Sequence, residues 1–278
     1  LKKYEIIEGI NDSKKISPKK REKLYYEIIN QAIAVGIGVV HEDQIDKMNI
    51  LEATYLAMKK SIGMLSIKPE QVLIDGPRSN IKHYKTEHII NGDSLSQTIG
   101  AASIIAKVYR DKIMLEYDKV FSIYNFKNNK GYGTKAHIEA INRFKTSPVH
   151  RKSFKIVSSK MPNYEFVLKN YGFNILAKQL VATKYIKNNY IVLDQDIISG
   201  KTSDYIDLYL KKNEHYLFIK VVSSYNDEKS KINKSKFYKL LIEKYLQEKD
   251  IKTKNDFVVI SVKFKNKNKP IIKTIVIE

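Results

Sequence analysis

The order of elements in the first half of the chain is the feature that most narrows its fold. Short apolar runs suited to strands cover residues 32–40, 72–74 and 89–90. They alternate with segments whose apolar residues recur every three or four positions, the spacing typical of helices. Strands that alternate with helices predict an α/β fold.

Three helices are expected between and after these runs. Ser17 followed by Pro18 is typical of a helix N-cap with proline at the first helical position. A second helix opens at Asp43 and presents an apolar face that ends at Ile62. A third, long helix follows Asp93, and its spacing predicts these inward side chains: Ile99, Ala102, Ala106, Tyr109 and Ile113.

Length and charge limit the class of protein. The 278 residues predict about two domains, and the net charge of +20 favours a polyanionic partner. Only five basic residues are arginine, all in the first half, so a lysine outside a motif is interpreted as part of a solvated face. The absence of cysteine and of an 18-residue apolar run predicts a cytoplasmic protein without disulfides, thiolate metal sites or a membrane span.

A change in composition divides the chain, because all five arginines lie in its first half. Residues 158–163 read as a connector, which predicts one domain over 1–159 and a second over 160–278. Each half has a net charge of +10, so charge does not distinguish them.

Two aspartates are the first candidates for chemistry. Asp75 ends an apolar strand, and Asp93 lies between a second strand and a helix. Ligands bind at the carboxyl edge of open α/β sheets, and paired carboxylates with water and phosphate oxygens suit Mg²⁺. The alternative is that Asp75 forms a turn and Asp93 caps a helix.

The sequence motifs around these aspartates resemble those of bacterial ribonuclease HII, and they follow one another in the same order over residues 5–157. The matching segments are Gly9-Ile-Asn-Asp-Ser-Lys-Lys-Ile-Ser-Pro-Lys-Lys-Arg-Glu-Lys-Leu24, Ile45-Asp46, Val72-Leu-Ile-Asp-Gly76, Gly92-Asp93, Ala101-Ala-Ser-Ile-Ile-Ala-Lys-Val-Tyr-Arg-Asp111, Asn129-Lys-Gly-Tyr-Gly-Thr-Lys-Ala-His137 and His150-Arg-Lys-Ser-Phe154.

This resemblance implies a ribonuclease H-like fold and an endonuclease of DNA replication and repair. Such enzymes cut the RNA strand of RNA–DNA hybrids, and cut 5′ to ribonucleotides embedded in DNA, with four carboxylates and two Mn²⁺ or Mg²⁺ ions. Two of those carboxylates correspond to Asp75 and Asp93, as catalytic metal ligands. Lys14 and Lys15 correspond to backbone contacts, and Tyr132 to the aromatic that packs against the sugar at the RNA–DNA junction.

Three further residues carry alternatives. Tyr132 lies between Lys130 and Lys135, which suits a nucleic-acid surface, although a core tyrosine at a helix start is the alternative. Asp111 is interpreted as a structural partner at a helix end rather than a metal ligand. His137 is interpreted as a capping or packing residue rather than a base.

The chain departs from the family in its first segment. The Asp-Glu-x-Gly-Arg-Gly motif, which carries the family's first two carboxylates, is absent from this sequence. Leu95 occupies a position at which many relatives have a basic residue. We therefore expect a ribonuclease H-like domain without its first strands, which binds metal weakly and does not complete a two-metal site. The chain, which begins at Leu1, is expected to be a fragment of an active enzyme or else a decayed copy. A catalytically dead nucleic-acid-binding protein is the alternative function, and no protein partner is inferred.

The second half resembles the YraN family, whose fold is restriction endonuclease-like, over residues 168–262. A helix over 172–186 and strands over 190–193, 205–210 and 216–222 follow its order. Asp207 matches one carboxylate of that family, but Lys220 and Val222 replace its second carboxylate and its lysine. The resemblance therefore implies a second α/β domain without a working metal site; a basic accessory domain is the alternative.

The C-terminal lysines alternate with other residues. Lys263, Lys265, Lys267 and Lys269 predict one exposed strand face, which would guard a sheet edge or touch phosphates.

Overall fold

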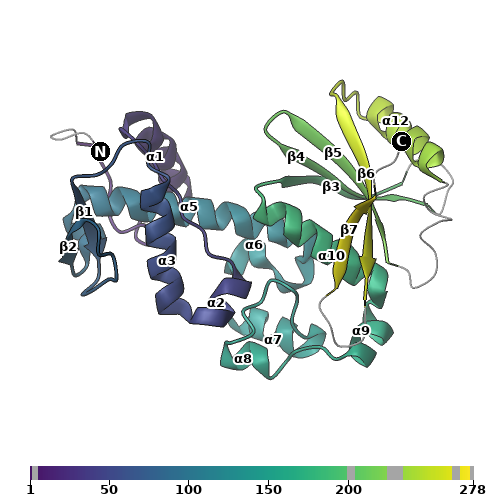
Figure 1. The fold of residues 1–278 in the computed structure, drawn as a ribbon, viewed down its shortest axis with the longest axis horizontal. Helices are drawn as coiled ribbons and strands as arrows, with labels where there is room; N and C mark the ends of the chain where they lie inside the picture. Colours follow the sequence, from purple (N-terminus) through teal and green to yellow (C-terminus); the bar gives the residue numbers. More distant parts are fainter. Residues whose placement is uncertain (2–5, 199–203, 224–233, 265–269, 276–278) are drawn as a thin grey trace. The chain divides into compact units, whose positions relative to one another are not determined.

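The computed structural model describes residues 1, 6–198, 204–223, 234–264 and 270–275 in two compact units (Figure 1). Unit 1 comprises Leu1–Met114 and Arg151–Ser158, and unit 2 comprises Leu115–His150 and Ser159–Glu278. The boundary predicted near residue 159 separates two family resemblances. A division of the chain into compact units does not test such a boundary, so it stays a prediction. No helix in the described part of the chain is both long and apolar enough to cross a membrane.

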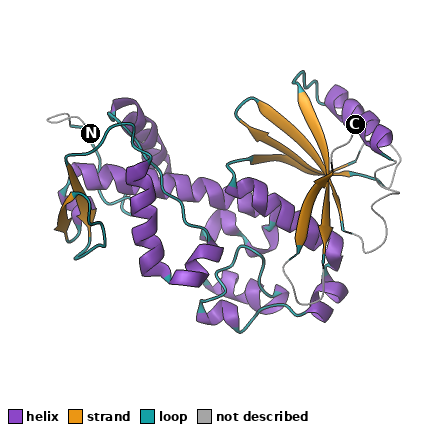
Figure 2. Ribbon diagram, in the orientation of Figure 1, coloured by secondary structure: helices purple, strands orange, loops and turns teal. Residues whose placement is uncertain are grey.

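Unit 1 joins a two-stranded sheet to several helices (Figure 2). Its elements are α1 (Pro18–Gln31), α2 (Glu42–Met48), α3 (Ile50–Gly63), β1 (Gln71–Asp75), β2 (Lys85–Ile89), α4 (Gly92–Leu95), the first part of α5 (Gln97–Val120) and α8 (Lys155–Ser158). The expected cap of α1 is present, with Pro18 at its start and the Ser17 hydroxyl accepting the Lys20 N–H.

The strand predicted at residues 72–74 is confirmed as β1. A second strand is present where residues 89–90 predicted one, but β2 begins at Lys85 and ends at Ile89, so the predicted position is about four residues too late. The two strands pair in parallel, with Gln71 opposite Lys85 and Asp75 opposite Ile89. Parallel pairing brings both carboxyl ends to one edge of the sheet, as the α/β prediction requires.

The strand expected over residues 32–40 is wrong. This segment carries no strand pairing and lies against α3. A Cβ on Gly36 would stand 2.0 Å from the Ser61 carbonyl oxygen, and one on Gly38 would stand 1.9 Å from that of Ala57. The glycines therefore serve close approach to a helix, which an apolar pattern cannot distinguish from a strand.

The single helix expected from Asp43 to Ile62 is two helices, α2 and α3, which divide at Asn49. Asn49 has φ of 78°, and its side-chain oxygen accepts the N–H groups of Leu51 and Glu52. Asparagine tolerates left-handed backbone and caps helices well, so one residue ends the first helix and starts the second.

The core of unit 1 forms where α1 packs on α5. Its buried cluster contains Ile7, Ile16, Leu24, Tyr25, Ile28, Ala101, Ile104, Ile105 and Val108. The inward face predicted for α5 is therefore wrong in phase: Ile99 is buried, but Ala102 and Ala106 are exposed. Alanines carry little hydrophobic signal, and the α1 contact decides the buried stripe.

Unit 2 begins within α5 and contains both small helices and a larger sheet. Its elements are η1 (Ser122–Tyr124), α6 (Phe126–Asn129), α7 (Lys135–Phe144), α9 (Tyr164–Asn170), α10 (Gly172–Lys187), β3 (Ile191–Ile197), β4 (Ile206–Lys212), β5 (His215–Val222), α12 (Ser235–Glu248), β6 (Asn255–Lys263) and β7 (Ile271–Ile275).

The five strands of unit 2 lie in the order β3-β4-β5-β6-β7. All neighbours are antiparallel except β5 and β6, which are parallel and joined through α12. Residues 206–210 of β4 are all buried, so helices cover both faces of this strand. Tyr238 and Leu241 of α12 belong to one buried cluster with the sheet, and α10 contacts β3, β4 and β5 (Figure 1).

The helix and the three strands predicted for residues 172–222 are confirmed as α10, β3, β4 and β5. The predicted face of C-terminal lysines lies largely outside the described residues. Lys263 ends β6, and Lys265, Lys267 and Lys269 fall in the undescribed segment 265–269.

Candidate functional site

Asp75 and Asp93 come together at the carboxyl edge of the β1–β2 pair. Asp75 is the exposed last residue of β1, and Asp93 is half-buried in the first turn of α4, just after β2. The Asp75 carboxylate accepts the N–H of Gly92 at 2.9 Å, which joins the end of β1 directly to the residue preceding Asp93. The Ser94 hydroxyl donates to Asp93 at 3.4 Å.

A close backbone approach fixes the Asp93 turn. A Cβ on Gly100 would stand 2.9 Å from the Asp93 carbonyl oxygen and 2.7 Å from the Ile10 side chain. Since Gly100 lies in α5, only glycine there lets the helix approach both the Asp93 turn and the segment before Asp12.

The donor set suits one hard divalent ion better than two. Carboxylate oxygens are the ligands that Mg²⁺ and Mn²⁺ accept, together with water and phosphate oxygens. Among the described residues, no group of three or more His, Cys, Asp or Glu side chains could hold a metal ion. Asp75 and Asp93 therefore fit a single, weakly held ion and do not by themselves fit a two-metal site.

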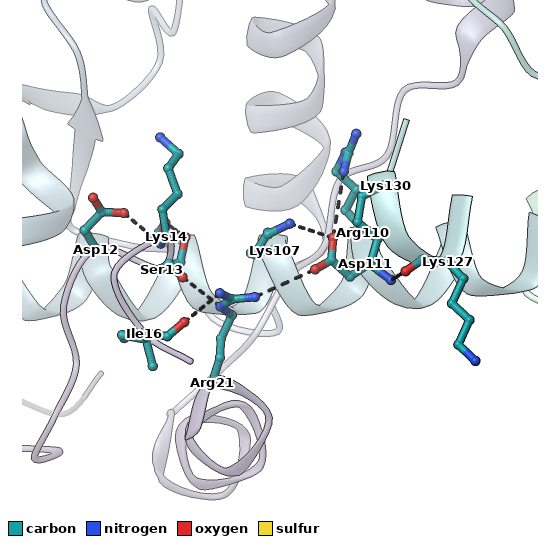
Figure 3. Close-up of polar contacts among 11 residues, drawn as sticks. Asp12, Ser13, Lys14, Ile16, Arg21, Lys107, Arg110, Asp111, Lys127 and Lys130 are labelled. Carbon is teal, nitrogen blue, oxygen red and sulfur yellow. Dashed lines mark hydrogen bonds and ion pairs between the residues drawn. The ribbon is translucent and has the colours of Figure 1, made fainter. Parts of the chain in front are cut away.

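Lys14 and Lys15 lie in a tight loop between Asn11 and α1, and Figure 3 shows Lys14 projecting from it. The Asp12 side chain accepts the Lys14 N–H at 2.9 Å, and the Asp12 carbonyl accepts the Lys15 N–H at 2.9 Å. Both lysines are exposed, whereas Ser13 between Asp12 and Lys14 is buried. The loop thus presents two cations from an anchored backbone, as a phosphate contact requires.

Arg21 anchors this loop from α1. Its guanidinium donates to the carbonyls of Ser13 and Ile16, both at 2.7 Å, and lies 3.7 Å from the Asp111 carboxylate (Figure 3). The Ser103 hydroxyl of α5 donates to Ser13 Oγ at 2.9 Å. Buried polar groups of the loop are therefore satisfied from two helices.

Asp111 is a structural partner, as expected, but it does not lie at a helix end. It sits inside α5 and accepts a hydrogen bond from Lys107 at 2.8 Å, with Arg110 at 3.8 Å. Three cations, Arg21 included, surround this one carboxylate, which suits an ion-pair hub rather than a metal ligand (Figure 3).

Tyr132, in unit 2, is exposed rather than a core tyrosine. Its side chain is 56% accessible, in a loop between α6 and α7. Lys130 and Gly131 have φ of 50° and 77°, and the buried Asn129 side chain accepts the Gly131 N–H at 2.7 Å. The same side chain donates to the Tyr124 carbonyl at 2.6 Å, so the loop is held from beneath while its aromatic ring faces outward.

His137 is a packing residue, as expected, and the structure shows that it packs against a second histidine, His150. The Ser147 N–H donates to His150 Nδ1 at 3.0 Å, so that nitrogen carries no proton and the His150 proton is on Nε2. His150 Nε2 donates to His137 Nε2 at 3.1 Å, which leaves the His137 proton on Nδ1. His137 Nδ1 then donates to the Tyr132 carbonyl at 2.8 Å.

The carboxylate predicted to survive in the second half, Asp207, forms a buried ion pair with Lys220. The two residues face each other across β4 and β5, 3.0 Å apart, with 4% and 7% of their side chains accessible. Lys220 also donates to the Tyr205 carbonyl at 2.8 Å, and Asp207 accepts the Val221 N–H at 2.8 Å. Burial raises the pKa of the Asp207 carboxyl, an effect that the Lys220 ammonium opposes.

The sequence profile of the ribonuclease HII family matches residues 3–157, more than half of the chain. The chain belongs to the ribonuclease HII family. The matched region contains Asp75, Asp93, Lys14, Lys15 and Tyr132.

Proteins named ribonuclease HII from several bacteria are close in sequence over this region. The one from Clostridioides difficile (strain 630) is 50% identical over 154 residues, which are 55% of this chain and 60% of that protein. Those from Coxiella burnetii (strain Dugway 5J108-111) and Acholeplasma laidlawii (strain PG-8A) are 52% and 51% identical, over 75% and 74% of their lengths. The chain thus spans about three fifths to three quarters of the ribonuclease HII proteins that it matches.

Sequence reasoning missed the residues that support the site. The motifs that match ribonuclease HII contain Arg21, Ser103 and His150. A motif by itself does not show which of its residues hold the loops through hydrogen bonds. Arg21 has one available signal: it is a lone arginine on a lysine-rich helix, and arginine suits buried, multidentate contacts better than lysine.

Proposed function

We propose that this chain acts as an endonuclease that cuts the RNA strand of RNA–DNA hybrids and cuts 5′ to ribonucleotides in DNA. The observation that carries the proposal is the pairing of Asp75 and Asp93 at the carboxyl edge of parallel strands, inside the ribonuclease HII region. We place this activity in the cytoplasm, in DNA replication and repair.

Each candidate residue has a role in this proposal. Asp75 and Asp93 would hold Mn²⁺ or Mg²⁺ against a phosphodiester, Lys14 and Lys15 would contact backbone phosphates, and Tyr132 would pack against the sugar at the junction. A bound divalent ion supplies charge neutralisation and an activated water. The two-ion version of this chemistry needs ligands beyond Asp75 and Asp93, so these two residues are assigned one ion.

A duplex that contains one ribonucleotide tests the proposal. With Mn²⁺, the chain is expected to cut 5′ to that ribonucleotide. Asp75→Asn should abolish cutting and leave binding within about twofold, because the loss of one ligand removes the ion but keeps the phosphate contacts. Asp250→Asn makes the same charge change at an exposed position and is the control. Equal loss of cutting and binding in Asp75→Asn would contradict the metal role.

A nucleic-acid-binding protein without hydrolysis is the second candidate. The observation that favours it is the donor set of only two carboxylates in the described part of the chain. The same assay separates the two candidates: a duplex that is shifted on a gel but stays intact with Mn²⁺ supports binding alone.

We further propose that unit 2 contains a YraN-like, restriction endonuclease-like domain without a metal site. The Lys220 ammonium supports this proposal, because it occupies the position beside the Asp207 carboxylate where a metal ion would bind. Calorimetric titration with Mn²⁺ tests it in the Asp75→Asn, Asp93→Asn double variant, which should show no binding. Binding that persists and is lost on Asp207→Asn would contradict this assignment.

A further inference from the structure

We propose that His137 and His150 are positioning residues that set the exposed Tyr132 ring for the pentose at an RNA–DNA junction. The inference rests on the proposed function, and it extends that function from Tyr132 to two buried residues that touch no substrate. Its basis is the directed chain of hydrogen bonds from Ser147 through both imidazoles to the Tyr132 carbonyl.

The chain of hydrogen bonds has only one direction with neutral rings. A backbone N–H cannot accept, so the Ser147 N–H makes His150 Nδ1 an acceptor, and the Ser147 hydroxyl lies 2.8 Å from the same nitrogen. Each later proton position follows from that first bond. The Tyr132 carbonyl therefore receives an N–H from His137 and a second one from Thr134, at 2.8 Å each.

The rings are also held from the sides. His150 lies 4.8 Å from the Tyr124 ring and His137 lies 5.5 Å from the Phe126 ring, centroid to centroid, both in tilted or edge-on contacts. Both histidines are buried, at 4% and 7% accessibility, beneath a tyrosine that is 56% accessible. A rigid buried base thus carries an exposed aromatic platform.

Packing alone does not require this polarity. Phenylalanine could fill the space beside the Tyr124 and Phe126 rings equally well. In both histidines, however, each ring nitrogen has a polar partner. Buried polar chains favour one geometry because an unpaired member costs about 1–3 kcal/mol. This series of hydrogen bonds therefore fixes the backbone geometry at Tyr132.

Two variants of one position separate positioning from packing. In His137→Asn the amide nitrogen stands near the place of Nδ1 and keeps the donor to Tyr132. In His137→Gln the longer amide stands near the place of Nε2, so it keeps the partner of His150 but loses the donor to Tyr132. Both remove the ring, so loss of packing affects them alike.

The first measurement is the preference for a ribonucleotide-containing duplex over an all-DNA duplex, from anisotropy in EDTA. Tyr132→Ala should lower this preference about tenfold, within the range of one lost stacking contact. His137→Gln should lower it to a similar extent, and His137→Asn should rescue most of it. Equal loss in both His137 variants would overturn the inference and leave a packing role.

A second measurement does not depend on the proposed function. The chain has no tryptophan, so Tyr132→Trp places a single tryptophan at the loop, and its fluorescence can be excited selectively over that of the tyrosines. Adding His137→Gln to it should change the acrylamide quenching constant about twofold, while His137→Asn should not; identical quenching in all three proteins overturns the inference. If wild type does not distinguish the duplexes, the proposed function fails, and quenching still decides whether His137 sets the loop.

Discussion

Asp207 and Lys220 show how a single buried pair decides the stability of its surroundings. Because Asp207 is buried, its carboxylate is tolerated only with the ammonium and the Val221 N–H beside it. Asp75 is the opposite case, an exposed carboxylate at a sheet edge. Exposure, rather than residue type, separates the candidate site from the structural pair.

Lys220→Met is expected to destabilise the protein by about 3–5 kcal/mol, because it leaves the Asp207 charge buried and unpaired. The companion Asp207→Asn, Lys220→Met double variant should recover most of that loss. Urea denaturation followed by circular dichroism measures both. A single variant within about 1 kcal/mol of wild type would show that the pair contributes little.

The same substitution has a predicted pH dependence. Burial holds the folded-state pKa of Asp207 above its unfolded value of 3.8, so between these two values the folded state binds more protons. This group's contribution to stability therefore falls as pH rises through that window. Without the ammonium that opposes the shift, the window widens, so Lys220→Met should lose more stability at pH 7 than at pH 5. An equal loss at both values would contradict the assigned cause.

At the scale of elements, the Lys14–Lys15 loop depends on two helices. Arg21 of α1 holds two loop carbonyls, and Ser103 of α5 holds Ser13. The dipeptide of lysines is visible in sequence, but the reason it forms a fixed surface lies in the α1–α5 packing.

Arg21→Ala should weaken nucleic-acid binding in the way that loss of the loop lysines does. Its expected signature is a log K against log salt slope that is smaller by about one to two, as if one or two phosphate contacts were lost. Lys19→Ala, which removes an exposed cation from the same helix, is the control and should change the slope by less. Slopes that match in Arg21→Ala and Lys19→Ala would rule out the anchoring role.

At the scale of the whole molecule, the charge of +20 acts on any nucleic acid alike. Binding to all-DNA and to ribonucleotide-containing duplexes should weaken with salt at the same slope, because phosphate contacts carry no sugar information. The ratio of the two affinities should then stay constant between about 50 and 200 mM salt. A ratio that disappears at high salt would place the discrimination in charge rather than at Tyr132.

The sequence by itself determined the local signals: the Ser17–Pro18 helix start, the strands that end at Asp75 and precede Asp93, and the helix and first three strands of the second half. These follow from capping, turn chemistry and hydrophobic period, which act over a few residues. Tertiary structure alone decided that residues 32–40 pack on α3, that Asn49 divides a helix, and that α5 buries a different stripe. It also decided the partners of Arg21, His137 and Lys220, because hydrogen bonds and ion pairs join residues that chain-local patterns do not connect.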